Sequence, residues 1–290
     1  MFSASDIKDL RERTGAGMLD CKKALEDSNG NMEAAIDWLR EKGISKMAKK
    51  EARIAAEGLA EILVDGNNAI IVEVNSETDF VAKNEEFKSF IAMVSKTVLN
   101  SDVTDMESAM DLKTDGGTIK EVLTALVAKI GEKISFRRFE KVTKNDNEAF
   151  GRYLHMGGKI AVLTVIDGND GEIARDVAMH VAAMNPGYIT RDEVPAEVLE
   201  KEKAIIKEQA INEGKTPEIA EKMVMGRINK YYKEACLLEQ QFVKDPDLTV
   251  ADYLAKNNSA IKNVTRYGVG EGIEKKSEDF ASEVMKQING

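Results

Sequence analysis

The order in which the hydrophobic pattern changes along this chain constrains its fold more than any single motif does. Residues 59–64 and 69–74 are apolar runs typical of strands, and the sequence DGNN between them, at 65–68, favours a tight hairpin. Helical periodicity follows, and the alternating stretch 134–142 then predicts another strand. A hairpin, helices and a closing strand in this order predict one α+β unit.

The same order of elements then occurs a second time. Paired strands are expected over residues 149–155 and 159–166, a helix over 172–184, and a closing strand over 264–269. Because the whole order recurs, we expect two related α+β subdomains to form the core of the protein.

The second copy is longer than the first because two charged helical segments lie within it, between residues 195 and 235. The run GKTP at 214–217 separates them, which predicts an antiparallel helical hairpin inserted into the second subdomain. The apolar stripes of these helices are too narrow for a deep core, so we expect the hairpin to mediate homodimer contacts. The alternative is a solvated hairpin that only supports the second subdomain.

The first 45 residues have the pattern of three short helices, which predicts a small bundle resembling the ubiquitin-associated fold. Gly43 is expected to end the third helix. The basic stretch 46–57 that follows is compatible with a helix, and we interpret it as a linker helix. In the second helix the positions expected to face inward are Met18, Cys21, Ala24 and Leu25.

Together these patterns predict an α+β protein with an N-terminal three-helix bundle, a core of two related subdomains and a C-terminal helix. The last helix is expected to begin near Ser277. The expected divisions are the bundle at 1–45, the linker helix at 46–57, the first subdomain at 58–142, the second at 143–194 with 236–275, the hairpin at 195–235 and the C-terminal helix at 276–290.

The composition argues against several classes of partner. A net charge of −10 disfavours a broad nucleic-acid or membrane surface, because phosphate binding depends on clustered Lys and Arg. No apolar run approaches the roughly 18 residues of a membrane span. Cys21 and Cys236 lie far apart and outside any CxxC pair, so we interpret both as reduced thiols without a metal or a disulfide. We therefore expect a cytoplasmic protein whose target is another protein.

Catalytic and cofactor motifs are missing from the sequence, which lacks HExxH, GxSxG and GxxxxGK[ST]. His180 lies in an apolar helical stretch and is expected to be a hydrogen-bonded core residue. The glycines at 268–272 do not have the GxGxxG spacing, and we expect a turn there. The acidic run 167–171 has glycine where a calcium loop needs a ligand. We therefore expect no metal, no cofactor and no enzymatic activity.

The polar run NSETDFVAKN at 75–84 follows a strongly apolar strand and contains an isolated aromatic residue. From the residues alone, two interpretations stay open. In the first, Thr78 caps the next helix, Asp79 complements its dipole, and Phe80 turns into the core. In the second, Phe80 is an apolar anchor at a helix N-terminus, flanked by the Asp79 carboxylate and presented to a pocket on a partner.

Several stretches of the chain resemble one protein family, in the same order along the sequence. Residues 10–25, LRERTGAGMLDCKKAL, and residues 73–83, EVNSETDFVAK, are similar to the two signatures of the elongation factor Ts family of the bacterial type. The stretches KIGEKI at 129–134, HMGGKI at 155–160 and GVGEGIEK at 268–275 are similar to further segments of that family. The resemblance covers essentially the whole chain.

The resemblance implies a guanine-nucleotide exchange factor that binds elongation factor Tu in its GDP form, displaces Mg²⁺ and promotes GDP release. It implies no cofactor and no covalent chemistry. The residues it implies for the loop that enters the GTPase domain are Thr78, Asp79, Phe80 and Val81, with Phe80 as the wedge. The further partner contacts it implies are Arg11, Met18, Leu19, Lys22 and His155.

Two other classes of function stay open on the sequence. The N-terminal bundle alone suggests an adaptor that binds ubiquitin-like proteins, and residues 1–45 should then bind such proteins in isolation. An enzyme with an unrecognised acidic site, such as residues 167–170, is the other class. Turnover of a small substrate with a metal would favour it.

Overall fold

The computed structural model describes residues 2–14, 16–48 and 50–274, without the side chains of 44–46. The expected C-terminal helix at 276–290 therefore lies outside the described residues. The chain divides into two compact units. One reaches Val142 and also includes Met156–Ile160 and the residues from Tyr267, and the other comprises Thr143–His155 and Ala161–Arg266.

The N-terminal bundle consists of α1 (Ala4–Thr14), α2 (Met18–Asp27) and α3 (Met32–Ala48). Its core contains Leu10, Cys21, Ala24, Leu25 and Ala35, all fully buried. The prediction of an inward face on α2 is confirmed for three of its four residues and is wrong for Met18, whose side chain is exposed. Met18 is the first residue of α2, so it lies beyond the part of the stripe that packs inside the bundle.

The third helix does not end at Gly43, and the expected linker helix over 46–57 is absent from the described residues. Helix α3 continues to Ala48, the chain turns through residues 50–53, and it is extended until β1 begins at Glu57. Gly43 faces α7 (Ile119–Ile130), where an added Cβ would lie 3.5 Å from Cγ2 of Thr124. Packing against α7 therefore outweighs the low helix propensity of glycine.

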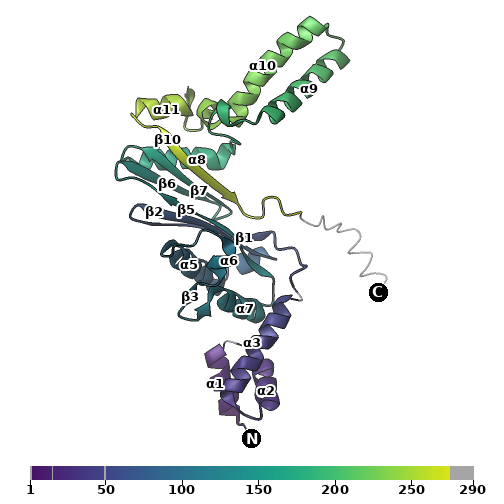
Figure 1. Ribbon diagram of the computed structural model, residues 1–290, viewed down its shortest axis with the longest axis vertical. Helices are drawn as coiled ribbons and strands as arrows, with labels where there is room; N and C mark the ends of the chain where they lie inside the picture. Colours follow the sequence, from purple (N-terminus) through teal and green to yellow (C-terminus); the bar gives the residue numbers. More distant parts are fainter. Residues whose placement is uncertain (1, 15, 49, 275–290) are drawn as a thin grey trace. The chain divides into compact units, whose positions relative to one another are not determined.

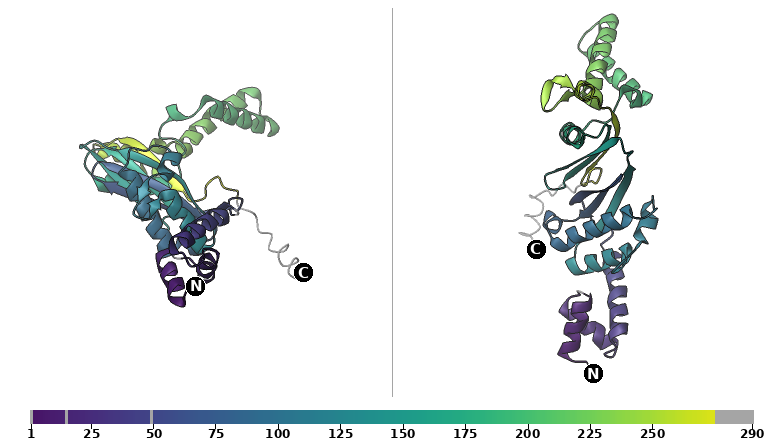
Figure 2. Two further views of the ribbon diagram at one scale, coloured as in Figure 1. Left: turned by 60° about the horizontal axis from the view of Figure 1, so that its bottom comes forward. Right: turned by 90° about the vertical axis from the view of Figure 1, so that its left-hand side faces the viewer.

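The first sheet has the strand order β1 (Glu57–Asp65), β2 (Asn68–Ser76), β5 (Ile134–Thr143). Strands β1 and β2 form the expected antiparallel hairpin, in which Asp65 pairs with Asn68 across a two-residue turn. Helices α5 (Glu85–Leu99) and α7 pack with this sheet in one apolar cluster (Figures 1 and 2). Short elements complete this part of the chain: α4 (Asp79–Ala82), α6 (Met106–Met110), β3 (Lys113–Thr114) and β4 (Gly117–Thr118).

The second sheet repeats the arrangement of the first. Its strand order is β10 (Ile261–Gly268), β7 (Ile160–Asp167), β6 (Glu148–His155). In both sheets the closing strand pairs with the second strand of the hairpin, so the predicted recurrence is confirmed. Helix α8 (Gly171–Met184) packs against β6, and a Cβ at Gly151 would lie only 2.1 Å from the Ala174 backbone.

The insertion forms the expected helical hairpin, with α9 (Ala196–Asn212) and α10 (Pro217–Ala235) side by side and projecting from the sheet of their unit (Figure 1). Large apolar side chains on these helices remain exposed: Ile205, Ile211, Ile219 and Met225. The short helix η1 (Arg191–Glu193) precedes the hairpin. The elements that connect the hairpin to the closing strand are η2 (Leu237–Glu239), β8 (Gln241–Phe242), β9 (Asp245–Thr249) and α11 (Val250–Lys256).

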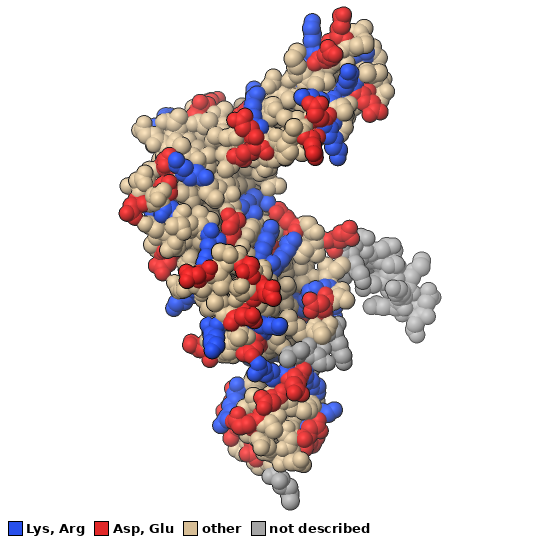
Figure 3. All heavy atoms as spheres, in the orientation of Figure 1, with Lys and Arg blue, Asp and Glu red and all other residues tan. Residues whose placement is uncertain are grey.

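Gly268 ends β10, and residues 269–272 of the glycine-rich segment form the expected turn, with Gly270 and Gly272 at positive φ angles of 75° and 76°. Basic and acidic side chains are interspersed over the face of the molecule shown in Figure 3. Among the described residues, no helix combines the length and the apolar character that crossing a membrane requires.

Candidate functional site

The connection between β2 and α5 contains the isolated aromatic residue on the one-turn helix α4. Thr78 has an extended backbone and caps α4, because its Oγ1 accepts a hydrogen bond from the Val81 N–H at 3.5 Å. Asn84 then caps α5 by accepting from the N–H groups of Glu86 and Phe87. Two consecutive caps therefore define where this loop begins and ends.

Thr78 is also held from a distant part of the chain. Its N–H donates to Oε2 of Glu132 at 3.0 Å, and its hydroxyl donates to Oε1 of the same carboxylate at 2.7 Å. Glu132 directly follows Gly131, which ends α7 in the left-handed conformation with φ of 87°. The neighbouring Ser76 hydroxyl donates to the Thr78 carbonyl at 2.9 Å. The N–H, the hydroxyl and the carbonyl of the capping residue are thus all anchored.

A second carboxylate also anchors the loop, but this one belongs to the loop itself. The Glu77 side chain accepts a hydrogen bond from the Lys133 N–H. Arg53 lies 3.3 Å from the same carboxylate, and the Lys133 ammonium donates to the carbonyl of Glu51. The loop is therefore bound to two other segments, the turn after α7 and the turn after α3.

Phe80 projects from this anchored loop with 78% of its surface exposed. The next two residues, Val81 and Ala82, are buried in the core of the first sheet and its helices. The interpretation of Phe80 as a core residue is therefore wrong, while the expected Thr78 cap is confirmed. A single helical turn directs successive side chains about 100° apart, so Val81 packs inward while Phe80 points to solvent.

The charges beside Phe80 form a local pair. Lys83 donates to Oδ2 of Asp79 at 2.7 Å, one turn along the helix, and its ammonium lies 5.7 Å from the centre of the Phe80 ring. The hydrogen bond from Lys83 lowers the pKa of Asp79 below its ordinary value. An exposed apolar ring therefore lies beside an ionised carboxylate on this loop.

The N-terminal bundle exposes a second apolar surface. Leu19 is 83% exposed and Met18 is 59% exposed at the start of α2. Lys22 lies one turn further on and forms a 3.7 Å ion pair with Glu26. Arg11 is exposed on α1. All four of the bundle residues considered as partner contacts are therefore accessible.

The two histidines have different environments. His155 is exposed at the end of β6, in the second unit, and stacks on Tyr153 with ring centres 6.2 Å apart. His180 is fully buried: its Nδ1 accepts from the Val243 N–H at 3.2 Å, and its Nε2 lies 2.9 Å from Oε1 of Gln240. Burial lowers the pKa of His180. The expectation of a hydrogen-bonded core histidine is confirmed.

Comparison with known protein families decides what kind of protein carries these surfaces. The family model described as Elongation factor TS matches residues 77–271, which is more than half of the chain. The chain belongs to the elongation factor Ts family. Membership implies a nucleotide-exchange factor for elongation factor Tu in translation elongation rather than a catalytic enzyme in the usual sense. The matched region begins at Glu77, inside the anchored loop, and ends in the glycine-rich turn.

One buried ionic cluster is not predicted by the sequence patterns. The Glu73 carboxylate on β2 is fully buried, and it accepts from Arg137 at 2.9 Å and from Arg138 at 2.6 Å. Asn75 and the N–H of Gly270 complete its hydrogen bonds at 3.1 and 2.9 Å. Burial alone would raise the pKa of Glu73, but these hydrogen bonds outweigh it and lower the pKa. A glutamate within an apolar strand was the available signal.

Two carboxylates of the acidic run 167–171 have structural roles. Asp170 caps α8, and Asp167 forms a 2.9 Å ion pair with Lys262. Among the described residues, no group of three His, Cys, Asp or Glu side chains has an arrangement suited to a metal ion.

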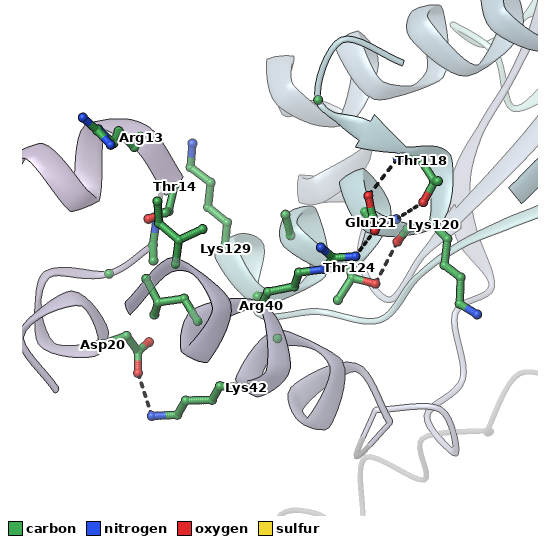
Figure 4. Close-up of a pocket in the computed structure, with 18 of the residues that line it drawn as sticks. Arg13, Thr14, Asp20, Arg40, Lys42, Thr118, Lys120, Glu121, Thr124 and Lys129 are labelled. Atoms are coloured by element: carbon green, nitrogen blue, oxygen red, sulfur yellow. Dashed lines mark hydrogen bonds and ion pairs between the residues drawn. The ribbon is translucent and has the colours of Figure 1, made fainter. Parts of the chain in front are cut away.

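A pocket of about 630 Å³ lies between the bundle and α7 (Figure 4). Four of its charged lining residues pair with each other: Arg40 with Glu121, and Lys42 with Asp20 at 3.2 Å. Thr118 and Glu121 form the capping box of α7 in the same wall. The pocket therefore has the character of a seam between packed helices.

Proposed function

We propose that this chain binds elongation factor Tu in its GDP form through Thr78, Asp79, Phe80 and Val81, displaces Mg²⁺ and accelerates GDP release. The observation that carries the proposal is the exposed Phe80 ring on a loop in which the N–H and the hydroxyl of Thr78 are both hydrogen-bonded to Glu132. Val81 also supports the proposal, because its side chain is buried in the core of the first sheet and its helices and so fixes the loop to them.

Phe80 acts as an apolar wedge in this mechanism. Fully burying a Phe side chain is favourable by about 1.5–3 kcal/mol, so a pocket that opens as GDP leaves would be stabilised by the ring. Because the loop is already anchored, little ordering entropy is lost when the ring is inserted. The energy of the contact is therefore available to distort the nucleotide site.

Exchange of this kind needs no covalent chemistry. A factor that weakens nucleotide binding to its partner is itself bound more weakly, to the same degree, when nucleotide is present. Incoming GTP therefore releases the factor. Mg²⁺ is held by oxygen ligands in a strict octahedral geometry, so a small shift of the partner's loops is enough to weaken its binding.

Further contacts would add affinity outside the loop. The exposed residues of the bundle, Met18 and Leu19, provide apolar area, and the remaining contacts in this proposal are Arg11, Lys22 and His155. The α9–α10 hairpin would mediate a homodimer, an idea supported by its exposed Ile219 and Met225. In this proposal the protein works in the cytoplasm without contacting nucleic acid or membrane.

The direct test uses purified elongation factor Tu loaded with a fluorescent GDP and chased with excess unlabelled GDP. The full-length chain is expected to accelerate the loss of fluorescence in proportion to its concentration until the partner is saturated. An unchanged release rate at micromolar concentrations of this chain would contradict the proposal.

A further inference from the structure

Glu132 lies outside the loop, and its carboxylate accepts hydrogen bonds from both donors of one loop residue, Thr78. Its Oε2 accepts the Thr78 N–H at 3.0 Å and its Oε1 accepts the Thr78 hydroxyl at 2.7 Å. The two residues are 54 positions apart in the sequence. Hydrogen bonds to an ionised acceptor are shorter and stronger than neutral ones, so this contact is suited to fixing a backbone position.

The contact at Thr78 controls the helical turn that carries Phe80. A hydroxyl has one hydrogen to donate and lone pairs to accept with. Because the Thr78 hydrogen points at Glu132, its oxygen is oriented to accept from the Val81 N–H and so to cap α4. A four-residue helix is not stable by itself, since helix nucleation is unfavourable. The position of Phe80 therefore depends on the cap, and the cap depends on Glu132.

A second carboxylate joins the same two segments, with donor and acceptor reversed: Glu77 of the loop accepts from the Lys133 N–H after α7. Gly131 permits these two contacts, because its left-handed φ of 87° turns the chain from α7 toward the loop. The two glutamates thus form a reciprocal clasp between adjacent turns.

We propose that Glu132 is a positioning residue of the exchange loop: it holds Thr78 so that Phe80 stays in the conformation that acts on the partner. This inference rests on the proposed exchange function. Glu132 has its effect through Thr78 and makes no contact with the leaving nucleotide. Its removal leaves the Phe80 ring present but spread over several orientations, only a fraction of which are productive.

The clasp is tested first in the free protein by hydrogen–deuterium exchange of a peptide covering residues 76–84. Glu132→Gln keeps the shape of the side chain but replaces one carboxylate oxygen by an NH₂ group, so that one of the two Thr78 donors loses its acceptor. Deuterium uptake at Thr78 and Val81 is expected to become about tenfold faster in Glu132→Gln. The matched control is Glu86→Gln, which removes an exposed carboxylate paired with Lys129 at 2.7 Å. Unchanged uptake in Glu132→Gln would overturn the inference.

The functional consequence is measured by GDP release at increasing concentrations of each variant. Glu132→Gln is expected to lower the maximal release rate about tenfold, while the half-saturating concentration changes little. A loss of folded protein would instead raise the half-saturating concentration without lowering the maximum. If Glu132→Gln does not fold, Thr78→Val is used, because it removes the hydroxyl and keeps the carboxylate.

Thr78→Val combined with Glu132→Gln separates the clasp from an independent effect. Residues that act through one contact are not additive, so the double variant is expected to be little slower than the slower single variant. Fully multiplied effects would contradict the inference.

If Phe80→Ala slows release but Glu132→Gln does not, the positioning role fails and the proposed function stands. If Phe80→Ala has no effect, the proposed function fails, whatever the deuterium uptake shows.

Discussion

The buried carboxylate of Glu73 accepts the backbone N–H of Gly270 at 2.9 Å, across 197 positions of the sequence. Gly270 has a positive φ of 75°, and an added Cβ would lie 2.2 Å from the carbonyl oxygen of Ala56. The close approach needs glycine at this point. The glycine-rich segment, which is one of the stretches similar to the elongation factor Ts family, thus has a structural role in joining the turn to β2.

Glu73→Ala is expected to lower the free energy of unfolding by about 3–5 kcal/mol, because it leaves Arg137 and Arg138 without their buried partner. Urea unfolding followed by circular dichroism measures the change. Glu85→Ala provides the control, since its 2.8 Å pair with Lys88 lies at the surface and contributes at most about 1 kcal/mol. Equal effects of the two substitutions would contradict the role assigned to the cluster.

Phe80→Ala is expected to slow stimulated GDP release by roughly one to three decades, since truncating a buried interface anchor costs about 2–4 kcal/mol. Its melting temperature should stay close to that of the wild type, because the ring is exposed in the free protein. The neighbouring Val81→Ala should instead lower the free energy of unfolding by roughly 1–3 kcal/mol, because Val81 is buried. Thermal melts and fluorescent-GDP release, measured on both variants, distinguish an interface role of Phe80 from a core role. A large fall in the Phe80→Ala melt would support a core role.

Asp79→Ala is expected to slow release less than Phe80→Ala does, by about tenfold at most. Asp79 is half-exposed and already paired with Lys83, so a single hydrogen bond to the partner is worth about 0.5–1.5 kcal/mol. The release assay compares the two substitutions at equal saturation. An effect of Asp79→Ala that exceeds that of Phe80→Ala would assign the main role to the carboxylate rather than to the ring.

Acidification is expected to destabilise the protein through His180. Burial lowers its pKa in the folded state, whereas the unfolded chain binds a proton near pH 6.5. Below that pH the unfolded state therefore holds more protons. The His180 contribution to the free energy of unfolding is fully present above about pH 6.5 and falls by up to about 1.4 kcal/mol per pH unit toward the folded-state pKa.

The measurement is urea unfolding of the wild type and of His180→Gln between about pH 5 and pH 7.5. Carboxylates common to both proteins cancel in the comparison. The variant should show a flatter pH dependence, although its stability at neutral pH can be lower. Parallel curves for the two proteins would show that His180 is not the titrating group.

Ile219→Glu combined with Met225→Glu is expected to convert a homodimer to a monomer while the fold is kept, because both side chains are exposed on α10. Two carboxylates placed in an apolar interface would have to be desolvated, which disfavours association. Light scattering at tens of micromolar gives the mass of each protein. A wild type that is already monomeric under these conditions would refute the dimer.

Local sequence signals were sufficient for most elements of this fold. The hairpin turn at 65–68, the left-handed Gly131 after α7 and the capping box of Thr249 with Asp252 at α11 all depend on residues within four positions of each other. The chain's periodicity also located the inserted hairpin. Such features are predictable because turns, caps and amphipathic faces are determined by neighbouring residues.

Contacts between distant residues decided what the local pattern left open. Gly43 has the propensity of a helix end, yet α3 continues because that face packs on α7. The family resemblance identified the Phe80 loop, but its residues alone allowed both a core ring and an exposed one. The exposed state follows from Val81 filling the core and from Glu132 holding Thr78.

The sequence by itself therefore determined most of the elements, their repetition and the family. The tertiary structure decided which side chains of the loop are free to meet a partner and which carboxylates hold the loop in place. The physical reason is the range of the forces concerned. Helix and turn preferences act over a few residues, whereas Thr78 and Glu132 are 54 positions apart and come into contact only when the chain between them has folded.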